Sequence, residues 1–167
     1  MILFRAAVYT NSYKPGQNRY EKLNEVEKKL VRDVSDCLES WHYVGKQKFV
    51  DQMRSDGARI FLDSGAFSAY TLGVDLKVSD YCEYIERNRD IIRVEDGTVM
   101  ASVLDGIGDP LQTYRNQLEM EQRGFRPMPC YHFGEDERYL DHYIRNYEYI
   151  TLGGLVGAST DSLTKWL

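Results

Sequence analysis

Cysteine is scarce in this sequence and is not arranged for cross-linking or for metal binding. The 167 residues contain three cysteines, Cys37, Cys82 and Cys130, which lie far apart and show no Cys-x-x-Cys spacing. An odd number of scattered cysteines argues against a disulfide framework and against a structural zinc site within the chain. We therefore expect each cysteine to act as a small buried hydrophobic residue, and we expect no metal and no cofactor.

The sequence also lacks a basic excess and a long apolar run. It has 21 Lys and Arg against 26 Asp and Glu, which gives a formal net charge of −5. A general electrostatic clamp for nucleic acid is therefore not expected. Because we find no signal peptide and no run of about 18 apolar residues, a cytoplasmic protein without a membrane partner is predicted. No linker or low-complexity segment divides the chain.

Short apolar segments alternate with segments of helical periodicity along the chain. Strands are predicted at residues 2–9, 59–63, 98–104, 127–132 and 149–152. Between and after them, helices are predicted from an apolar stripe over Leu23–Cys37, then within residues 40–56 and 75–92, from Pro110 to Gly124, from Tyr139 onwards, and at the end of the chain around Leu163 and Trp166. The helix at Pro110 has a clear start, because Asp109 can cap its first turn. Its buried face is predicted to carry Leu111, Tyr114 and Leu118, and a turn is predicted at Asp96-Gly97.

This strand–helix alternation predicts an α/β fold with a parallel sheet and right-handed crossovers. One form is a doubly wound, flavodoxin-like sheet, in which the loop at Thr10-Asn11-Ser12 would have to hold a phosphate. The other form is part of a (β/α)8 TIM barrel, of which about five βα units would be present, since a full barrel needs about 250 residues.

Polar residues and glycines stand at the carboxyl ends of successive predicted strands. The pairs Asp63-Ser64 and Gly153-Gly154 follow two strands, and Asp105 and His132 end two others. Each has a structural explanation: the acids can accept from loop amides, the histidine can lie at the edge of the core, and the glycines can form a plain turn. Because a parallel sheet gathers these ends at one edge, however, together they indicate a binding site.

The chemistry of this set suits a planar ligand rich in nitrogen. A carboxylate can accept from two adjacent N–H donors such as those of a guanine edge, and a second carboxylate can accept another. Glycines allow a ring to approach the backbone closely. Phe67 or one of the thirteen tyrosines can stack on the ring.

At these residues the sequence resembles the queuine/archaeosine tRNA-guanine transglycosylase superfamily. Asp63-Ser64-Gly65-Ala66-Phe67 is similar to the family's Asp-Ser-Gly-Gly-Phe motif, and Leu152-Gly153-Gly154-Leu155-Val156-Gly157 is similar to its Val-Gly-Gly-Leu-Ala-Val-Gly segment. The variant Asp-Ser-Gly-Ala-Phe-Ser resembles phage-type relatives, among them the 7-deazaguanine DNA transglycosylases. The resemblance spans roughly residues 58–157.

The resemblance implies a (β/α)8 barrel that replaces guanine with a 7-deazaguanine in nucleic acid, with DNA favoured over tRNA. It implies that Asp63 is the catalytic acid/base residue and that Asp105 holds the purine edge. It assigns substrate binding to Ser64, Gly65, Ala66, Phe67, His132, Gly153, Gly154 and Leu155. The family has a Gln-Gly-Gly turn near the position where this chain has His132-Phe133-Gly134.

Two family features have no counterpart that we can identify in the sequence. The family's nucleophilic aspartate follows the Gly-Gly-Leu segment, and the family's tRNA enzymes bind a structural zinc through three cysteines and a histidine. We therefore expect residues 1–167 to be the N-terminal portion of a single barrel domain, which would act with a C-terminal half or as a homodimer. A non-catalytic purine-binding module and a self-contained flavodoxin-like domain remain the alternatives.

Overall fold

The computed structural model describes residues 3–9, 20–33, 36–155, 159–161 and 164, and shows a mixed α/β fold. Its strands are β1 (Arg5–Ala6), β2 (Asp36–Ser40), β3 (Arg59–Asp63), β4 (Val94–Glu95), β5 (Thr98–Val99), β6 (Cys130–His132) and β7 (Thr151–Gly153). Its helices are the short 3-10 turn η1 (Tyr20–Lys22), α1 (Glu25–Asp33), α2 (Trp41–Val44), α3 (Gln47–Ser55), α4 (Ala66–Thr71), α5 (Val78–Arg87), α6 (Pro110–Gln122) and α7 (Glu137–Asn146).

Parallel pairing passes from each segment to the next one along the chain. β1, β2 and β3 form a parallel sheet in that order, with Ser40 opposite Asp63 at its carboxyl edge. Single parallel bridges continue the series from Leu62 to Ala101 and from Ser102 to Met128, and β6 pairs in parallel with β7. This order has no reversal, whereas a doubly wound sheet needs one. The described strands do not close into a barrel.

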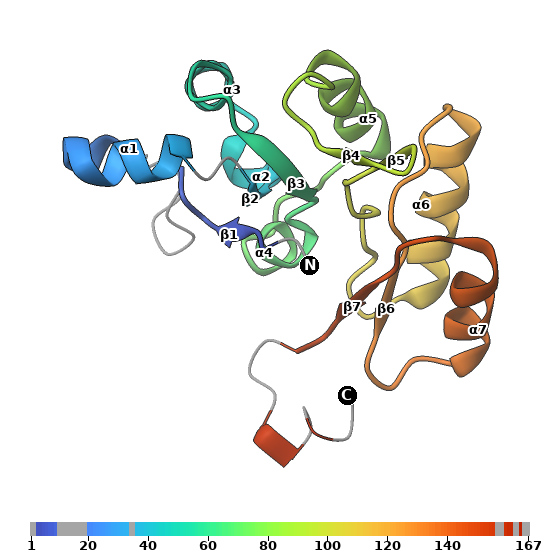
Figure 1. Ribbon diagram of the computed structural model, residues 1–167. Helices are drawn as coiled ribbons and strands as arrows, with labels where there is room; N and C mark the ends of the chain where they lie inside the picture. The colour runs from blue at the N-terminus through green and yellow to red at the C-terminus, as the bar shows by residue number, and fades with distance from the viewer. Residues whose placement is uncertain (1–2, 10–19, 34–35, 156–158, 162–163, 165–167) are drawn as a thin grey trace.

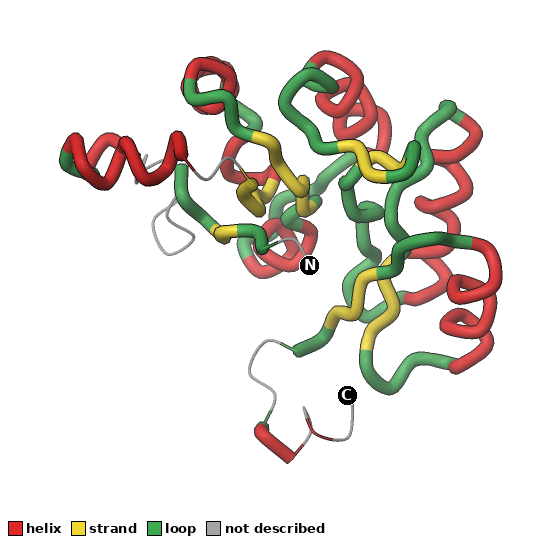
Figure 2. Tube along the Cα trace, viewed as in Figure 1, coloured by secondary structure: helices red, strands yellow, loops and turns green. Residues whose placement is uncertain are grey.

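The longer helices lie on one side of the strands. Figure 1 shows α1, α3, α5, α6 and α7 along the outside of an arc whose inner side is formed by the strands, and the same division of red helices from yellow strands is visible in Figure 2. The core fills the space between these layers, with fully buried residues such as Phe49, Ile60, Leu62 and Met120. No helix in the described part of the chain is long and apolar enough to cross a membrane.

The predicted helix over residues 23–37 is wrong at its carboxyl end. α1 ends at Asp33, and Cys37 lies in β2, the strand between β1 and β3 that the sequence analysis did not predict. The sequence Asp36-Cys37-Leu38-Glu39-Ser40 alternates between half-buried and buried residues, as a strand does. Glu39 can be buried there because its Oε1 accepts from the backbone N–H groups of Val8 (2.6 Å) and Tyr9 (2.9 Å).

Three other strand predictions are correct in place but too long, one of them being residues 127–132, within which β6 covers only Cys130–His132. Of residues 2–9, the described part contains the two-residue strand β1. Residues 98–104 contain β5, which forms a hairpin with β4 around the predicted Asp96-Gly97 turn, before the chain enters the parallel series. The predicted terminal helix around Leu163 and Trp166 and the loop at residues 10–12 lie outside the described residues.

The helix predicted at Pro110 is confirmed, but its buried face is not the predicted one. The Asp109 carboxylate accepts from the backbone N–H of Gln112 at 3.0 Å, as an N-cap does. The expected apolar face of Leu111, Tyr114 and Leu118 is not buried; instead, the helix buries Thr113, Asn116, Gln117 and Met120. Polar side chains occupy this face because they bond the backbone of neighbouring loops, as described below for Asn116.

Candidate functional site

A cavity of about 970 Å³ lies at the carboxyl ends of the parallel strands. A volume of this size suits a small-molecule ligand. Eight of the ten predicted site residues line it: Asp63, Gly65, Ala66, Phe67, Asp105, His132, Gly153 and Gly154. The structure therefore brings together segments that are up to 91 residues apart in sequence, counted from Asp63 to Gly154.

Asp63 ends β3 and is held in place by local hydrogen bonds. Its Oδ2 accepts from the Ser40 hydroxyl at 2.5 Å and from the Gly65 backbone N–H at 3.0 Å. Ser40 reaches Asp63 because β2 and β3 place these two residues side by side. The missed strand β2 therefore supplies a contact that orients the predicted acid/base residue.

Gly65 allows the chain to turn from β3 into α4. Its φ is +73°, in the left-handed region, and a Cβ at this position would lie 2.6 Å from Cβ of His42. The turn projects Phe67 from α4 towards the cavity, where its side chain is 53% exposed. Phe133 lines the same cavity and is 54% exposed, so two aromatic rings contribute to the cavity lining.

Two predicted site residues lie elsewhere. Ser64 is fully buried, its backbone N–H donates to Ser102 Oγ at 3.0 Å, and its hydroxyl accepts from Ala66 N at 3.4 Å. It therefore shapes the turn and does not line the cavity. Leu155 does not line the cavity either, and the following Val156 and Gly157 of the resemblance lie outside the described residues.

Asp105 is a mostly buried acid whose backbone is fixed by α6. The side-chain amide of Asn116 donates to the carbonyl oxygen of Leu104 at 2.6 Å, directly before Asp105. Oδ1 of Asp105 is buried without a hydrogen-bond partner. Burial is the main cause that raises the pKa of Asp105 to about 7; His132 opposes the increase, and Asp63 adds to it. The carboxyl of Asp105 is therefore harder to ionise than that of an exposed aspartate.

His132 is oriented by Glu135, a residue that the sequence analysis missed. Nδ1 of His132 lies 3.0 Å from Glu135 Oε1, and the backbone N–H of His132 donates to Glu135 Oε2 at 3.1 Å. This bidentate contact turns Nε2 towards Asp105, whose Oδ2 is 3.9 Å away. The available signal was an acid three residues after a histidine at a strand end.

The cavity is acidic and has little basic character. Four carboxylate residues line it, Asp63, Asp105, Glu135 and Asp136, and its described lining includes no lysine or arginine and a single histidine. A phosphate group would meet repulsion in this environment. A neutral ring with several N–H donors, or a cation, would find acceptors.

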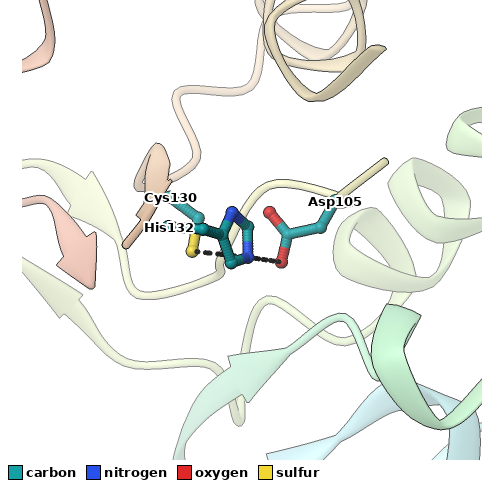
Figure 3. Close-up of side chains that lie close together, drawn as sticks. All are labelled: Asp105, Cys130 and His132. Atoms are coloured by element: carbon teal, nitrogen blue, oxygen red, sulfur yellow. Dashed lines mark hydrogen bonds and ion pairs between the residues drawn. The ribbon is translucent and has the colours of Figure 1, made fainter. Parts of the chain in front are cut away.

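Within the described parts of the chain, one group of side chains could hold a metal ion, although none was expected from the sequence. Potential ligand atoms of Asp105, Cys130 and His132 all lie within 4.8 Å of one another. Figure 3 shows the imidazole of His132 between the thiol of Cys130 and the carboxylate of Asp105. Sequence spacing did not reveal the group because Asp105 belongs to a different strand end from the other two residues.

The fold and the site define a mixed α/β protein with an acidic cavity at the carboxyl ends of parallel strands. Comparison of the chain with family models, with curated proteins and with solved structures gave no match. The description of the site therefore depends on the residues and their geometry.

Proposed function

We propose that this chain carries the purine-recognition site of a base-exchange transglycosylase, which replaces guanine with a 7-deazaguanine in nucleic acid. The observation that supports the proposal best is the cavity that joins the two resembling motifs. Asp63 and Phe67 of the first motif, and Gly153 and Gly154 of the second, line the same cavity as Asp105. The parallel strand order also agrees with an arc of a (β/α)8 barrel, which we include in the proposal.

The acceptors and rings of the cavity match a guanine-type base. Ionised Asp105 accepts the adjacent N–H donors of the pyrimidine ring edge, and its buried, unpartnered Oδ1 is available for one of them. Phe67 and Phe133 stack on the faces of the ring. Asp63, which is positioned by Ser40, moves the proton that the leaving and entering bases exchange.

The alternative of a purine-binding module without catalysis is favoured by the position of the carboxylates. Those that line the cavity, among the described residues, all precede Gly153, whereas the resemblance implies a nucleophilic aspartate after the Gly-Gly pair. After Gly154, the described residues include one carboxylate, that of Asp161, which is exposed and does not line the cavity. The polymer, DNA or tRNA, belongs to the proposal through the resemblance alone.

Base binding can be tested by calorimetric titration with guanine and with 7-deazaguanine. We expect Asp63→Asn and Asp105→Asn each to weaken binding about tenfold or more, because each loses charge-assisted acceptance of N–H groups. Asp141→Asn, on the exposed side of α7, is the matched control and should bind as the unchanged chain does. Equal affinity in all three variants would remove the basis of the proposal.

Base exchange is the test that separates an enzyme from a binding module. The chain is incubated with labelled guanine and either duplex DNA or tRNA, and the label in the polymer is counted. Label in DNA supports the transglycosylase with its favoured polymer, and label in tRNA supports the reaction but contradicts that preference. Base binding without label in either polymer supports the non-catalytic module.

A further inference from the structure

Nε2 of His132 faces the thiol of Cys130, which can donate its proton, and the carboxylate of Asp105. The proximity of Nδ1 to the Glu135 carboxylate assigns the proton of a neutral imidazole to Nδ1, which leaves a lone pair on Nε2. This lone pair points to Oδ2 of Asp105 at 3.9 Å and to Sγ of Cys130 at 3.7 Å. Three electron-rich atoms thus converge on one point, and Oδ1 of the same aspartate is buried without a partner. Either protons or a cation must occupy this point.

We propose that Asp105, Cys130 and His132 bind a divalent transition-metal ion of the zinc class, with a fourth coordination position open to the cavity. The separations of the ligand atoms are already close to those of a zinc site. Zinc bonds of about 2.0–2.3 Å at tetrahedral angles place a sulfur and a nitrogen ligand roughly 3.6 Å apart, and a nitrogen and an oxygen ligand roughly 3.3 Å apart. The corresponding distances here are 3.7 Å and 3.9 Å. The three ligand atoms all lie within 4.8 Å of one another, so shifts of roughly half an ångström to one ångström would complete the geometry.

The surroundings of the three ligands support a metal site. Glu135 accepts a hydrogen bond from Nδ1 of His132, the nitrogen that would not bind the metal. A hydrogen bond of this kind orients most metal-binding histidines and makes them better ligands. The cavity presents four carboxylate residues and no lysine or arginine in its described lining, so a cation is electrostatically favoured. The mixed thiolate, imidazole and carboxylate set selects zinc-class ions over Mg²⁺ or Ca²⁺, which prefer oxygen ligands.

Gly153 closes one side of the cluster. A Cβ at this position would lie 2.5 Å from Cδ2 and 2.7 Å from Nε2 of His132, and 3.0 Å from Sγ of Cys130. Any residue other than glycine at this position would therefore displace His132 and Cys130, which are two of the ligands. β7 places Gly153 there because it pairs with His132 in the parallel register.

This inference goes beyond the proposed function and does not depend on it. Both ligands use Asp105, so zinc and base are expected to compete, but each also needs residues that the other does not. Phe67→Ala should weaken base binding and leave zinc binding unchanged, whereas Cys130→Ser should abolish tight zinc binding. Failure of one proposal is thereby distinguished from failure of the other.

The affinity test is titration of Zn²⁺ into the metal-free full chain, measured by calorimetry. We expect one equivalent to bind, and Cys130→Ser and His132→Gln each to weaken binding at least tenfold. The chain has three cysteines and three histidines, which provides matched controls in Cys82→Ser and His142→Gln. No zinc binding by the unchanged chain, or equal affinity for Cys130→Ser and Cys82→Ser, would overturn the proposal.

A spectroscopic test uses the unchanged chain and so does not depend on the folding of a variant. Co²⁺ replaces Zn²⁺ in such sites, and a cysteine thiolate bound to it gives a charge-transfer absorption band in the near ultraviolet. On binding, Cys130 passes its thiol proton to the buffer and its sulfur forms the bond to the metal, so proton release accompanies the band. Absence of both the band and the proton release in the unchanged chain would contradict thiolate coordination.

Discussion

Asp105 is an acid in the cavity lining whose pKa lies well above that of an exposed aspartate. It is mostly buried, it lies near the carboxylates of Asp63 and Glu135, and its pKa is raised to about 7. An acid in this state is costly to ionise and therefore sensitive to pH. Residues of this kind are common at binding and catalytic sites, because a ligand can supply the hydrogen bonds or the opposite charge that the carboxylate lacks in the ligand-free protein.

Replacement of Asp105 by Asn should make stability less dependent on pH in chelator-treated, metal-free protein. Between about pH 4 and pH 7 the folded chain keeps a proton on Asp105 that the unfolded chain has lost. The free energy of unfolding of the unchanged protein should therefore fall as pH rises through this window. From about pH 4 to about pH 7, the difference in free energy of unfolding between Asp105→Asn and the unchanged protein should shift by roughly 2–4 kcal/mol in favour of the variant. Urea unfolding at each pH measures this difference.

The comparison is made between pH values within one variant, so that any constant effect of the amide cancels. Asp141→Asn again serves as the control and should follow the unchanged protein at each pH. Parallel stability curves for Asp105→Asn and the unchanged protein would contradict the raised pKa.

Gly65 and Gly73 separate two costs of placing alanine at a left-handed position. Their φ values are +73° and +67°, but a Cβ at Gly65 would collide with His42, whereas a Cβ at Gly73 meets nothing within 4 Å. Gly73→Ala should cost about 1 kcal/mol from backbone strain alone. Gly65→Ala should cost about 1–3 kcal/mol more because of overpacking, as measured by thermal or urea unfolding. Equal losses in the two variants would show that the contact with His42 relaxes freely.

At the scale of the elements, α6 fixes the position of the loop that carries Asp105. The helix starts at a defined residue, and its side chains bond the backbone of that loop. Its first turn is capped by Asp109, and its side chain Asn116 bonds the carbonyl oxygen of Leu104. The Gly106 backbone N–H also donates to the hydroxyl of Thr113 at 3.0 Å. The polar buried face of this helix is therefore a scaffold for the loop that carries Asp105.

Removal of the α6 cap should lower stability by a predictable amount. Asp109→Ala loses the carboxylate that accepts from Gln112 N, and we expect a loss of about 0.5–2 kcal/mol in the free energy of unfolding. Asp109→Asn keeps an oxygen acceptor and should retain most of that stability. If both variants lost the same amount, the negative charge at the helix start and not the capping bond would be the cause.

Sequence patterns located most helices of this chain but not all of its strands. The start of α6 was predictable because Asp109 and Pro110 are a local signal. The strand β2 was not predictable in the same way, because it is only five residues long and closely follows α1. Cys37 also continues the helical spacing of apolar residues that includes Leu30, so the segment was assigned to the helix. The buried face of α6 was wrong because apolar periodicity does not account for amides that bond loops.

The candidate site was predictable to the extent that parallel strands bring their ends together. Asp63, Asp105 and His132 were found by their positions after apolar segments, and the structure places all three on one cavity. Ser64 was misplaced because whether a residue at a strand end points inward depends on the turn geometry, which the sequence does not specify. Cys130 and Glu135 were missed because their importance depends on distances to other strand ends and side chains.

At the scale of the whole molecule, β3 lies in the middle of the parallel series. We therefore expect its backbone hydrogen bonds to open less often than those of the other strands. Within β3, Ile60 N donates to Ile91 O and Leu62 N donates to Met100 O, both at 2.8 Å, and both side chains are fully buried. Hydrogen exchange followed by mass spectrometry should show slower exchange for peptides covering β3 than for those covering β1 or β7. Equal protection of the three strands would indicate that the described part of the chain opens only as one unit.

The strand order also has a consequence for how the chain reaches this structure. Because each parallel segment pairs with its neighbour in sequence, the parallel series can grow from one segment to the next along the chain. A ribosome releases the amino-terminal segments earliest, so each new strand can add to an edge that is already in place. The same order that assembles the cavity from successive strand ends would also delay its completion until β7 has been synthesised.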